Sequence, residues 1–388
     1  MTKEEIYFIR FLSDHLNGRK TEPVYDLNWK EIYKLSNNHQ VTGIISAQCM
    51  FFIPPEMKPL FQRAQAKAFY YYLKRKNILK ELDDTFLEKE IEHFTVKGLL
   101  ISNYYPVPAL RTMGDIDLVV HTEDREKADT ILKEKNFHLT NQSNAEWVYF
   151  QNDIEIELHD HLIYGSIINQ GCLLEFFSSF WNFVDNDILD PSYHFLFLLL
   201  HIRKHFMYSG IGFRQFMDLA VMAVKEQSLD WIWIHEKLQE LDLLKFASTC
   251  FGFIKKWFDI LIPANNILPD EAFFETATET ILHNGVFGFH NKDNIGNMKV
   301  NIMRENKDRV FPNIRNATAV LFPSYQVMRK NRRYSFIDGK PQLTPIAWGY
   351  RVGLRLIDII KGKAEMPIVV PSKKKLIKRD EFLNNWGL

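Results

Sequence analysis

Two aspartates, Asp115 and Asp117, stand one residue apart in the run GDIDLVV (114–120). The apolar, β-branched residues around them predict a strand, in which alternate side chains project from the same face about 7 Å apart. Two carboxylates at that distance repel each other and are costly to desolvate. A divalent cation compensates for both effects, and Mg²⁺ prefers carboxylate and phosphate oxygens. The pair therefore predicts a metal site, although an exposed strand end or an Asx-type turn gives the same Asp-x-Asp pattern.

A second acidic strand is predicted at IEIELH (154–159), at a distance that a β-hairpin could span. Its alternation places isoleucine and leucine on one face and Glu155, Glu157 and His159 on the other. Beside the first strand, one glutamate would complete a cluster of three carboxylates; we assign Glu157, with Glu155 as its competitor. Two metal ions in such a cluster suit in-line attack on a nucleotide α-phosphate, since one activates the nucleophile and the other stabilises the leaving pyrophosphate. His159 could orient Glu157 or deprotonate an acceptor hydroxyl.

These motifs resemble the nucleotidyltransferase fold superfamily (polymerase β-like), whose signature is a Gly-Ser turn, Asp-x-Asp/Glu on a strand and a third acid on a neighbouring strand. The corresponding residues here are the Lys97-Gly98 turn, Gly114 to Asp117, and Glu157. In particular, the chain resembles a large bacterial family of uncharacterised nucleotidyltransferases with a core similar to RTMGDIDLVV (111–120). Further segments similar to that family are ELH (157–159), RQFMD (214–218), LFPS (321–324) and RRY (332–334).

The resemblance implies transfer of a nucleoside monophosphate from an NTP to an acceptor, with two Mg²⁺ ions held by Asp115, Asp117 and Glu157. We expect nucleotide contacts from the turn, from the loop before the first acidic strand and from a later helical region: Lys97, Gly98, Arg111, Gly114, Lys204, Arg214 and Asp218. Leu99 stands where the family's serine commonly contacts the triphosphate, so Lys97 or Ser102 is expected to supply that contact. Arg111 could neutralise phosphate charge or brace the acidic cluster, and arginine suits both roles.

A polar stripe is predicted on two later helices. His194, His201 and His205 fall on one face of a helix over 193–208, and Arg214 and Asp218 stand four residues apart on the next helix. The stripe could hold a base, a ribose or the acceptor. It could equally consist of buried, hydrogen-bonded histidines and an intrahelical ion pair. His201 and His205 also have a zinc-binding spacing, but HIRKH lacks the internal glutamate of the HExxH hydrolases.

The composition excludes several other classes of function. Lys plus Arg and Asp plus Glu both number 48, so no bulk charge favours nucleic acid, and the basic run RKNRR (329–333) is interpreted as a solvated face. The three cysteines fit neither a metal knuckle nor a disulfide framework. No GxGxxG or GxxxxGK[ST] loop occurs, and the longest apolar run, FLFLLL (195–200), is too short for a membrane span. We therefore expect a cytoplasmic protein with no membrane span and no specific nucleic-acid partner; its oligomeric state, acceptor and preferred base stay open.

The order of the predicted elements indicates an α+β fold, in which a small mixed β-sheet core is embedded in a largely helical protein. The predicted regions are an N-terminal helical region (1–92), a nucleotidyltransferase core (93–165), a helical domain (166–300) and a C-terminal region packing on the core (301–388). Two alternative functions fit the same residues. One is a catalytically inactive nucleotide- or ligand-binding module with this fold, and the other is a histidine-dependent metal hydrolase.

Overall fold

The computed structural model describes residues 1–143, 146–163, 171–208, 210–286, 325–328, 336–337, 339–360 and 373–388. The chain forms two compact units, Met1–Asn291 with Phe382–Leu388, and Lys292–Glu381. All of the site described below lies in the first unit. Three segments noted in the sequence, LFPS (321–324), RKNRR (329–333) and RRY (332–334), lie outside the described residues.

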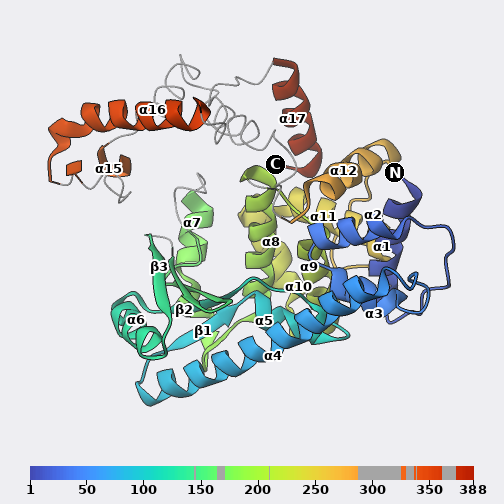
Figure 1. Ribbon diagram of the computed structural model, residues 1–388, viewed down its shortest axis with the longest axis horizontal. Helices are drawn as coiled ribbons and strands as arrows, with labels where there is room; N and C mark the ends of the chain where they lie inside the picture. Colours follow the sequence, from blue (N-terminus) through green and yellow to red (C-terminus); the bar gives the residue numbers. More distant parts are fainter. Residues whose placement is uncertain are drawn as a thin grey trace. The chain divides into compact units, whose positions relative to one another are not determined.

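The first unit begins with four helices (Figure 1): α1 (Lys3–Leu16), α2 (Trp29–Asn38), α3 (Thr42–Cys49) and α4 (Lys58–Glu88). α1 starts at a capping box, because Thr2 accepts a hydrogen bond from the backbone of Glu5 and the Glu5 side chain accepts one from the backbone of Thr2. The longest of them, α4, spans about 46 Å at 1.5 Å per residue.

A five-stranded mixed sheet follows α4, made of β1 (His93–Val96), β2 (Asp115–Val120), β3 (His138–Gln142), β4 (Trp147–Gln151) and β5 (Ile154–His159). The strand order is β1-β2-β5-β4-β3. β2 and β5 are parallel, and the other pairs are antiparallel. The two acidic strands are therefore not hairpin partners, because α6 (Arg125–Glu134) and the β3–β4 hairpin lie between them in the chain. The short helix α5 (Gly98–Ser102) links β1 to the loop before β2.

The two faces of the sheet pack against different parts of the protein. Ile116 and Leu118 of β2 point to the face that packs on α6 and on the end of α4, together with Leu158 of β5. Val119 points the other way and joins the large core formed by the helices. β2 is therefore covered on both sides, so Asp115 and Asp117 lie within the protein and not on an open sheet face.

The remaining helices of the first unit cover the acidic face of the sheet and extend away from it. They are α7 (Gly171–Ser178), α8 (Pro191–Tyr208), α9 (Phe213–Lys225), α10 (Trp231–Glu240), α11 (Leu244–Phe258) and α12 (Glu271–Asn284). A two-stranded ribbon precedes α8, formed by β6 (Val184–Asp185) and β7 (Ile188–Leu189). At the C-terminus, Trp386 is fully buried, and its ring centroid lies 4.3 Å from that of Phe253. The C-terminal tail therefore packs apolar side chains into the core of the first unit.

The second unit contains α15 (Tyr325–Met328), α16 (Thr344–Ile360) and most of α17 (Lys373–Trp386), with a small core at Met328, Ile337 and Ala347. Throughout the described part of the chain, every helix is too short or too polar to cross a lipid bilayer.

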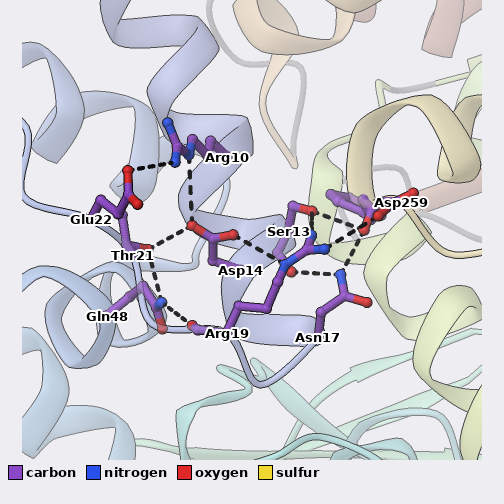
Figure 2. Close-up of polar contacts among 10 residues, drawn as sticks. Arg10, Ser13, Asp14, Asn17, Arg19, Thr21, Glu22, Gln48 and Asp259 are labelled. Carbon is purple, nitrogen blue, oxygen red and sulfur yellow. Dashed lines mark hydrogen bonds and ion pairs between the residues drawn. The ribbon is translucent and has the colours of Figure 1, made fainter.

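A polar network fixes the C-terminal end of α1 to α11 and to the loop that follows α1 (Figure 2). The Ser13 hydroxyl donates to the carbonyl oxygen of Phe258, at 2.8 Å, at the end of α11. Asp14 accepts a hydrogen bond from Thr21 at 2.9 Å and pairs with Arg19 at 3.4 Å. Since these side chains satisfy one another, the network holds the N-terminal helices in place and is assigned no chemical role.

Candidate active site

The acidic residues of the two strands meet because β2 and β5 are parallel and in register. Asp115 pairs with Glu155, and Asp117 pairs with Glu157, so that all four carboxylates project from one face. His159 lies one pleat further along β5, opposite Val119. In the described part of the chain, one set of three or more metal-ligand residues converges: the ligand atoms of Asp117, Glu157 and His159 lie within 4.8 Å of one another. Glu157, and not Glu155, belongs to this set.

Lys97 supplies the positive charge nearest to this cluster. Its Nζ lies 2.7 Å from Oδ1 of Asp117, whose side chain is almost fully buried. Burial alone would raise the pKa of Asp117, but Lys97 and His159 outweigh it and hold the pKa below its ordinary value. Asp115 differs, because burial and the charge of Asp117 raise its pKa. The pKa values of these two neighbouring carboxylates are thus shifted in opposite directions, which is typical of functional sites.

The imidazole of His159 lies between two carboxylates without a hydrogen bond. Its Nε2 is 3.4 Å from Asp117 and 3.4 Å from Glu157, and this buried atom has no hydrogen-bond partner. Burial would lower the pKa of His159, but the two carboxylates more than offset it and raise the pKa to about 9. At that pKa the imidazole carries a proton at neutral pH, so Nε2 could join the two carboxylates as a ligand for a metal cation only after it loses that proton.

The turn after β1 has an unusual backbone conformation. The positive φ of 57° falls on Lys97 and not on Gly98, although only glycine adopts such angles without strain. The conformation is held from outside, because the Lys97 N–H donates to Nε2 of His194 at 3.1 Å. Ser102 is fully buried and donates to the carbonyl oxygen of Leu99 at 2.6 Å, so its hydroxyl does not replace the missing serine at the cavity. Lys97 is the residue of the turn whose side chain reaches the carboxylates.

Arg111 braces the loop before β2. Its guanidinium binds both carboxylate oxygens of Asp218, at 3.1 and 2.7 Å, and Tyr105 donates to the same carboxylate at 2.8 Å. All three side chains are buried. The intrahelical pair considered for Arg214 and Asp218 is therefore replaced by a bond between Asp218 and Arg111. Of the two roles considered for Arg111, bracing is the one that this geometry supports.

Arg214 instead connects α9 to two loops. Its Nη1 donates to the side chain of Gln40 and, at 2.9 Å, to the carbonyl oxygen of Thr112. Its Nε is buried and has no hydrogen-bond partner. Burial and the neighbouring Arg111 lower the pKa of Arg214 to about 10, so the side chain is still charged at neutral pH.

Two histidines of α8, His201 and His205, line the same cavity. Nε2 of His201 and Nε2 of His205 lie 2.8 Å apart in a hydrogen bond, and burial, with nearby cations, lowers the pKa of both. Burial also lowers the pKa of His194, to about 4, which agrees with its role as an acceptor for Lys97. These imidazoles are therefore neutral at pH 7, and neither His201 nor His205 belongs to the convergent ligand set.

These side chains line one cavity of about 420 Å³. The predicted residues that line it are Lys97, Gly98, Arg111, Gly114, Asp115, Asp117, Glu157, His159, His201, Lys204, His205, Arg214 and Asp218. Three further candidates do not line it: Glu155, Ser102 and His194. Sequence reasoning missed Glu146, Phe197 and Gln215, which also line it, and Arg75, which donates to the Gly114 carbonyl at 2.7 Å. Gln215 stands within the RQFMD segment (214–218), but nothing in the local sequence marks the other three, because their position depends on tertiary contacts.

A family model described as an uncharacterised nucleotidyltransferase matches residues 25–259, which is more than half of the chain. The chain belongs to this nucleotidyltransferase family. The matched range of the nucleotidyltransferase contains the whole sheet, α8, α9 and every residue that lines the cavity except Val286. Comparison with curated proteins and comparison with solved structures find no match.

Proposed function

We propose that this nucleotidyltransferase transfers a nucleoside monophosphate from an NTP to an acceptor hydroxyl and releases pyrophosphate, with Asp115, Asp117 and Glu157 as its catalytic carboxylates. The observation that carries the proposal is their convergence, from two parallel strands, in a cavity that also contains Lys97, Lys204 and Arg214. A triphosphate is polyanionic, so binding it requires both cationic side chains and metal ions. We further infer that residues 93–165 form a polymerase β-like core.

The donor set fits a divalent cation. Asp117 and Glu157 offer hard oxygen atoms, and the buried Nε2 of His159 has no hydrogen-bond partner between them. Asp115, on the same face, extends the set toward the second of the two Mg²⁺ ions that we propose. Bound Mg²⁺ would neutralise phosphate charge and stabilise the attacking and leaving oxygens of an in-line displacement.

The protein's own residues position the substrate and balance its charge. Lys97, Lys204 and Arg214 would bind triphosphate oxygens, and the strained turn at Lys97 holds its ammonium among the carboxylates. The Arg111–Asp218 pair fixes the loop from which β2 starts, so that Asp115 and Asp117 keep their positions. Phosphoryl transfer asks little covalent chemistry of the protein, so placement and electrostatics suffice.

Mg²⁺-dependent pyrophosphate release tests the proposal. The purified protein is incubated with each of the four NTPs, labelled at the α-phosphate, with a small-molecule cell extract as the source of acceptor. We expect pyrophosphate and a labelled adduct with the wild-type protein. The rate of pyrophosphate release should be at least 100-fold lower with Asp117→Asn, because asparagine has the shape of aspartate but lacks the negative charge that would hold the metal. Glu123→Gln, an exposed carboxylate just beyond β2, serves as the control and should keep the wild-type rate. Equal rates for Asp117→Asn and the wild type would refute the assignment.

One observation favours a non-catalytic binding module instead. Leu99 replaces the usual serine, and Lys97 already neutralises Asp117 at 2.7 Å. Such a module would bind Mg²⁺–NTP but would release no pyrophosphate with any acceptor fraction. The metal hydrolase has less support, because His201 and His205 bond to each other beside Lys97 and Lys204; stoichiometric zinc in the purified protein would restore it.

A further inference from the structure

A second cavity, of about 520 Å³, lies beside the candidate active site. α4 forms one wall, and the end of α2 with the start of α3 forms another. The loop before β2, the β4–β5 turn and the end of α12 complete it. Its volume suits a small molecule of roughly the size of a sugar phosphate, and not a folded protein or a nucleic-acid helix.

The wall formed by α4 carries an aromatic side chain, two cationic side chains and two small alanines. Lys67, Tyr71 and Arg75 follow one another at four-residue intervals, and both cations lie against the Tyr71 ring, with centroid distances of 5.6 Å for Lys67 and 5.2 Å for Arg75. Ala64 and Ala68 stand on the same stripe, where their short side chains leave the volume open. This stripe thus presents one aromatic ring with two cations lying over it.

The opposite wall is rich in groups that bind hydroxyls. Asn37, Gln40 and Thr42 contribute amide and hydroxyl groups, and Tyr72 adds a phenol from α4. Asp153, at the β4–β5 turn, accepts a hydrogen bond from Tyr71 at 3.0 Å and lines the cavity. Amides, hydroxyls and one carboxylate around an aromatic ring match the donors and acceptors of a polyhydroxylated ligand, whose ring carbons pack on the aromatic face.

The second cavity shares two lining residues with the cavity that contains the carboxylates. Arg111 and Met113 line both cavities. Arg75 donates to the carbonyl oxygen of Gly114, directly before Asp115, and its Nε is buried without a hydrogen-bond partner. Arg75 is itself 95% buried, since only 5% of its surface is exposed. A charged group this buried, with one donor unused, is costly to the fold, and Arg75 is one of the residues that line the second cavity.

We propose that this second cavity is the acceptor site, and that its ligand is a polyhydroxylated small molecule with one anionic group, such as a sugar phosphate or a sugar acid. The inference rests on the proposed nucleotidyl transfer and names the class of its acceptor. Lys67 and Arg75 would bind the anionic group, the amides would bind hydroxyls, and Tyr71 would face the ring. Lys97 and Lys204 line the first cavity. We therefore assign the triphosphate to the first cavity and the acceptor to the second.

The reaction follows from this arrangement. A hydroxyl oxygen of the acceptor forms a bond to the α-phosphorus of the NTP while the bond from that phosphorus to the pyrophosphate oxygen breaks. Pyrophosphate leaves, and the hydroxyl proton passes to solvent. The product is a phosphodiester that joins the nucleoside monophosphate to the sugar derivative.

Calorimetric binding of defined probes tests the ligand class. Glucose 1-phosphate, glucose 6-phosphate, ribose 5-phosphate and glucuronate are compared with glucose, in the presence of Mg²⁺ and a non-hydrolysable ATP analogue. We expect at least one anionic probe to bind ten-fold or more tightly than glucose and to raise pyrophosphate release from ATP at least ten-fold. Lys67→Met should weaken that binding at least ten-fold, Lys67→Arg should retain it, and Ala64→Leu should abolish it by filling the cavity.

Matched controls lie on the same helix. Lys76→Met and Ala66→Leu change exposed residues of α4 that do not line the cavity, and both should bind the probes as the wild type does. The inference is overturned if no anionic probe binds, or if Lys67→Met and Ala64→Leu bind the probes unchanged. It is also overturned if Lys67→Met instead weakens binding of the ATP analogue ten-fold, since the cavity would then hold the nucleotide.

The two proposals fail in distinguishable ways. If Asp117-dependent pyrophosphate release occurs with cell extract, but no anionic sugar binds or accelerates it, the acceptor assignment is wrong and nucleotidyl transfer stands. If the probes bind in a Lys67-dependent manner but no NTP is turned over with any acceptor, nucleotidyl transfer fails. The acceptor role then fails with it.

Discussion

Arg111 shows how one residue's role depends on its partner. In the sequence it stands four residues before Asp115, where phosphate binding and structural bracing are equally plausible. In the structure its guanidinium forms two hydrogen bonds to Asp218, and Tyr105 completes the carboxylate's coordination. Burial would lower the pKa of Arg111, but the adjacent Asp218 outweighs it and raises the pKa. The pair fixes α9 to the loop that starts β2.

Removal of this cation should be strongly destabilising. We expect Arg111→Met to lower the free energy of unfolding by about 3–5 kcal/mol, because it leaves Asp218 charged and buried without its partner. Chemical denaturation of both proteins measures the difference. Lys237→Met, which breaks an exposed pair with Glu240, is the control and should change stability by less than about 1 kcal/mol. A loss as small as the control's would show that the buried pair is not structural.

At the scale of elements, the parallel pairing of β2 and β5 brings the acidic side chains together, and close packing of helices stabilises the first unit. Parallel alignment puts residues of equal register on the same face, so Asp117 and Glu157 converge. Elsewhere in the first unit, α11 packs so tightly against the segment at Ile267 that only a glycine fits at position 252, where an added Cβ would overlap the Ile267 carbonyl oxygen. Glycine is required there by close approach, although it disfavours a helix interior.

Two glycine substitutions separate packing from helix propensity. Gly252→Ala should destabilise the protein by about 2 kcal/mol or more, because backbone atoms of the neighbouring segment must move. Gly43→Ala, in α3, should be neutral or stabilising by up to about 1 kcal/mol, since its Cβ would make ordinary contacts with Ala68 and Leu110 at 3.4 and 3.5 Å. Thermal and chemical unfolding of both variants measure this. Equal effects of the two substitutions would contradict the packing argument.

At the scale of the whole first unit, His39 joins three helices. It lies at the end of α2, accepts a hydrogen bond at Nδ1 from the backbone of Phe213 in α9, and contacts the Leu282 carbonyl of α12 through Nε2. These two bonds require the neutral imidazole, with its proton on Nε2. Burial lowers the pKa of His39 from 6.5 to about 4.

Stability should therefore fall in mild acid. Because the folded pKa of His39 lies below its unfolded value, unfolding takes up a proton between pH 6.5 and about 4, and the free energy of unfolding declines as pH falls through that window. The loss from this residue is on the order of 3 kcal/mol. In denaturation curves recorded from pH 7 to pH 4, His39→Gln should show a shallower decline, since glutamine keeps a donor and an acceptor without titrating. An unchanged slope in the variant would assign the acid sensitivity to other groups.

Much of the site was predictable because its signals are local. The alternation in IEIELH, the Asp-x-Asp run and the turn after β1 depend on residues adjacent in the chain, and all three strands or turns occur where they were predicted. We assign Glu157 as the third carboxylate, but strand alternation alone does not separate it from Glu155, because both share one face of β5. Only the register with β2 brings Glu157 to Asp117.

The sequence by itself determined the elements, the acidic face of each strand and the chemistry that this face could support. The tertiary structure alone decided the parallel pairing of the acidic strands, the bond between Arg111 and Asp218 across 107 residues, and the cavity beside α4. The physical reason is the distance along the chain over which each interaction acts. Backbone periodicity and turn propensity act over a few residues, whereas burial, ion pairing and cavity shape depend on which distant segments the fold brings together.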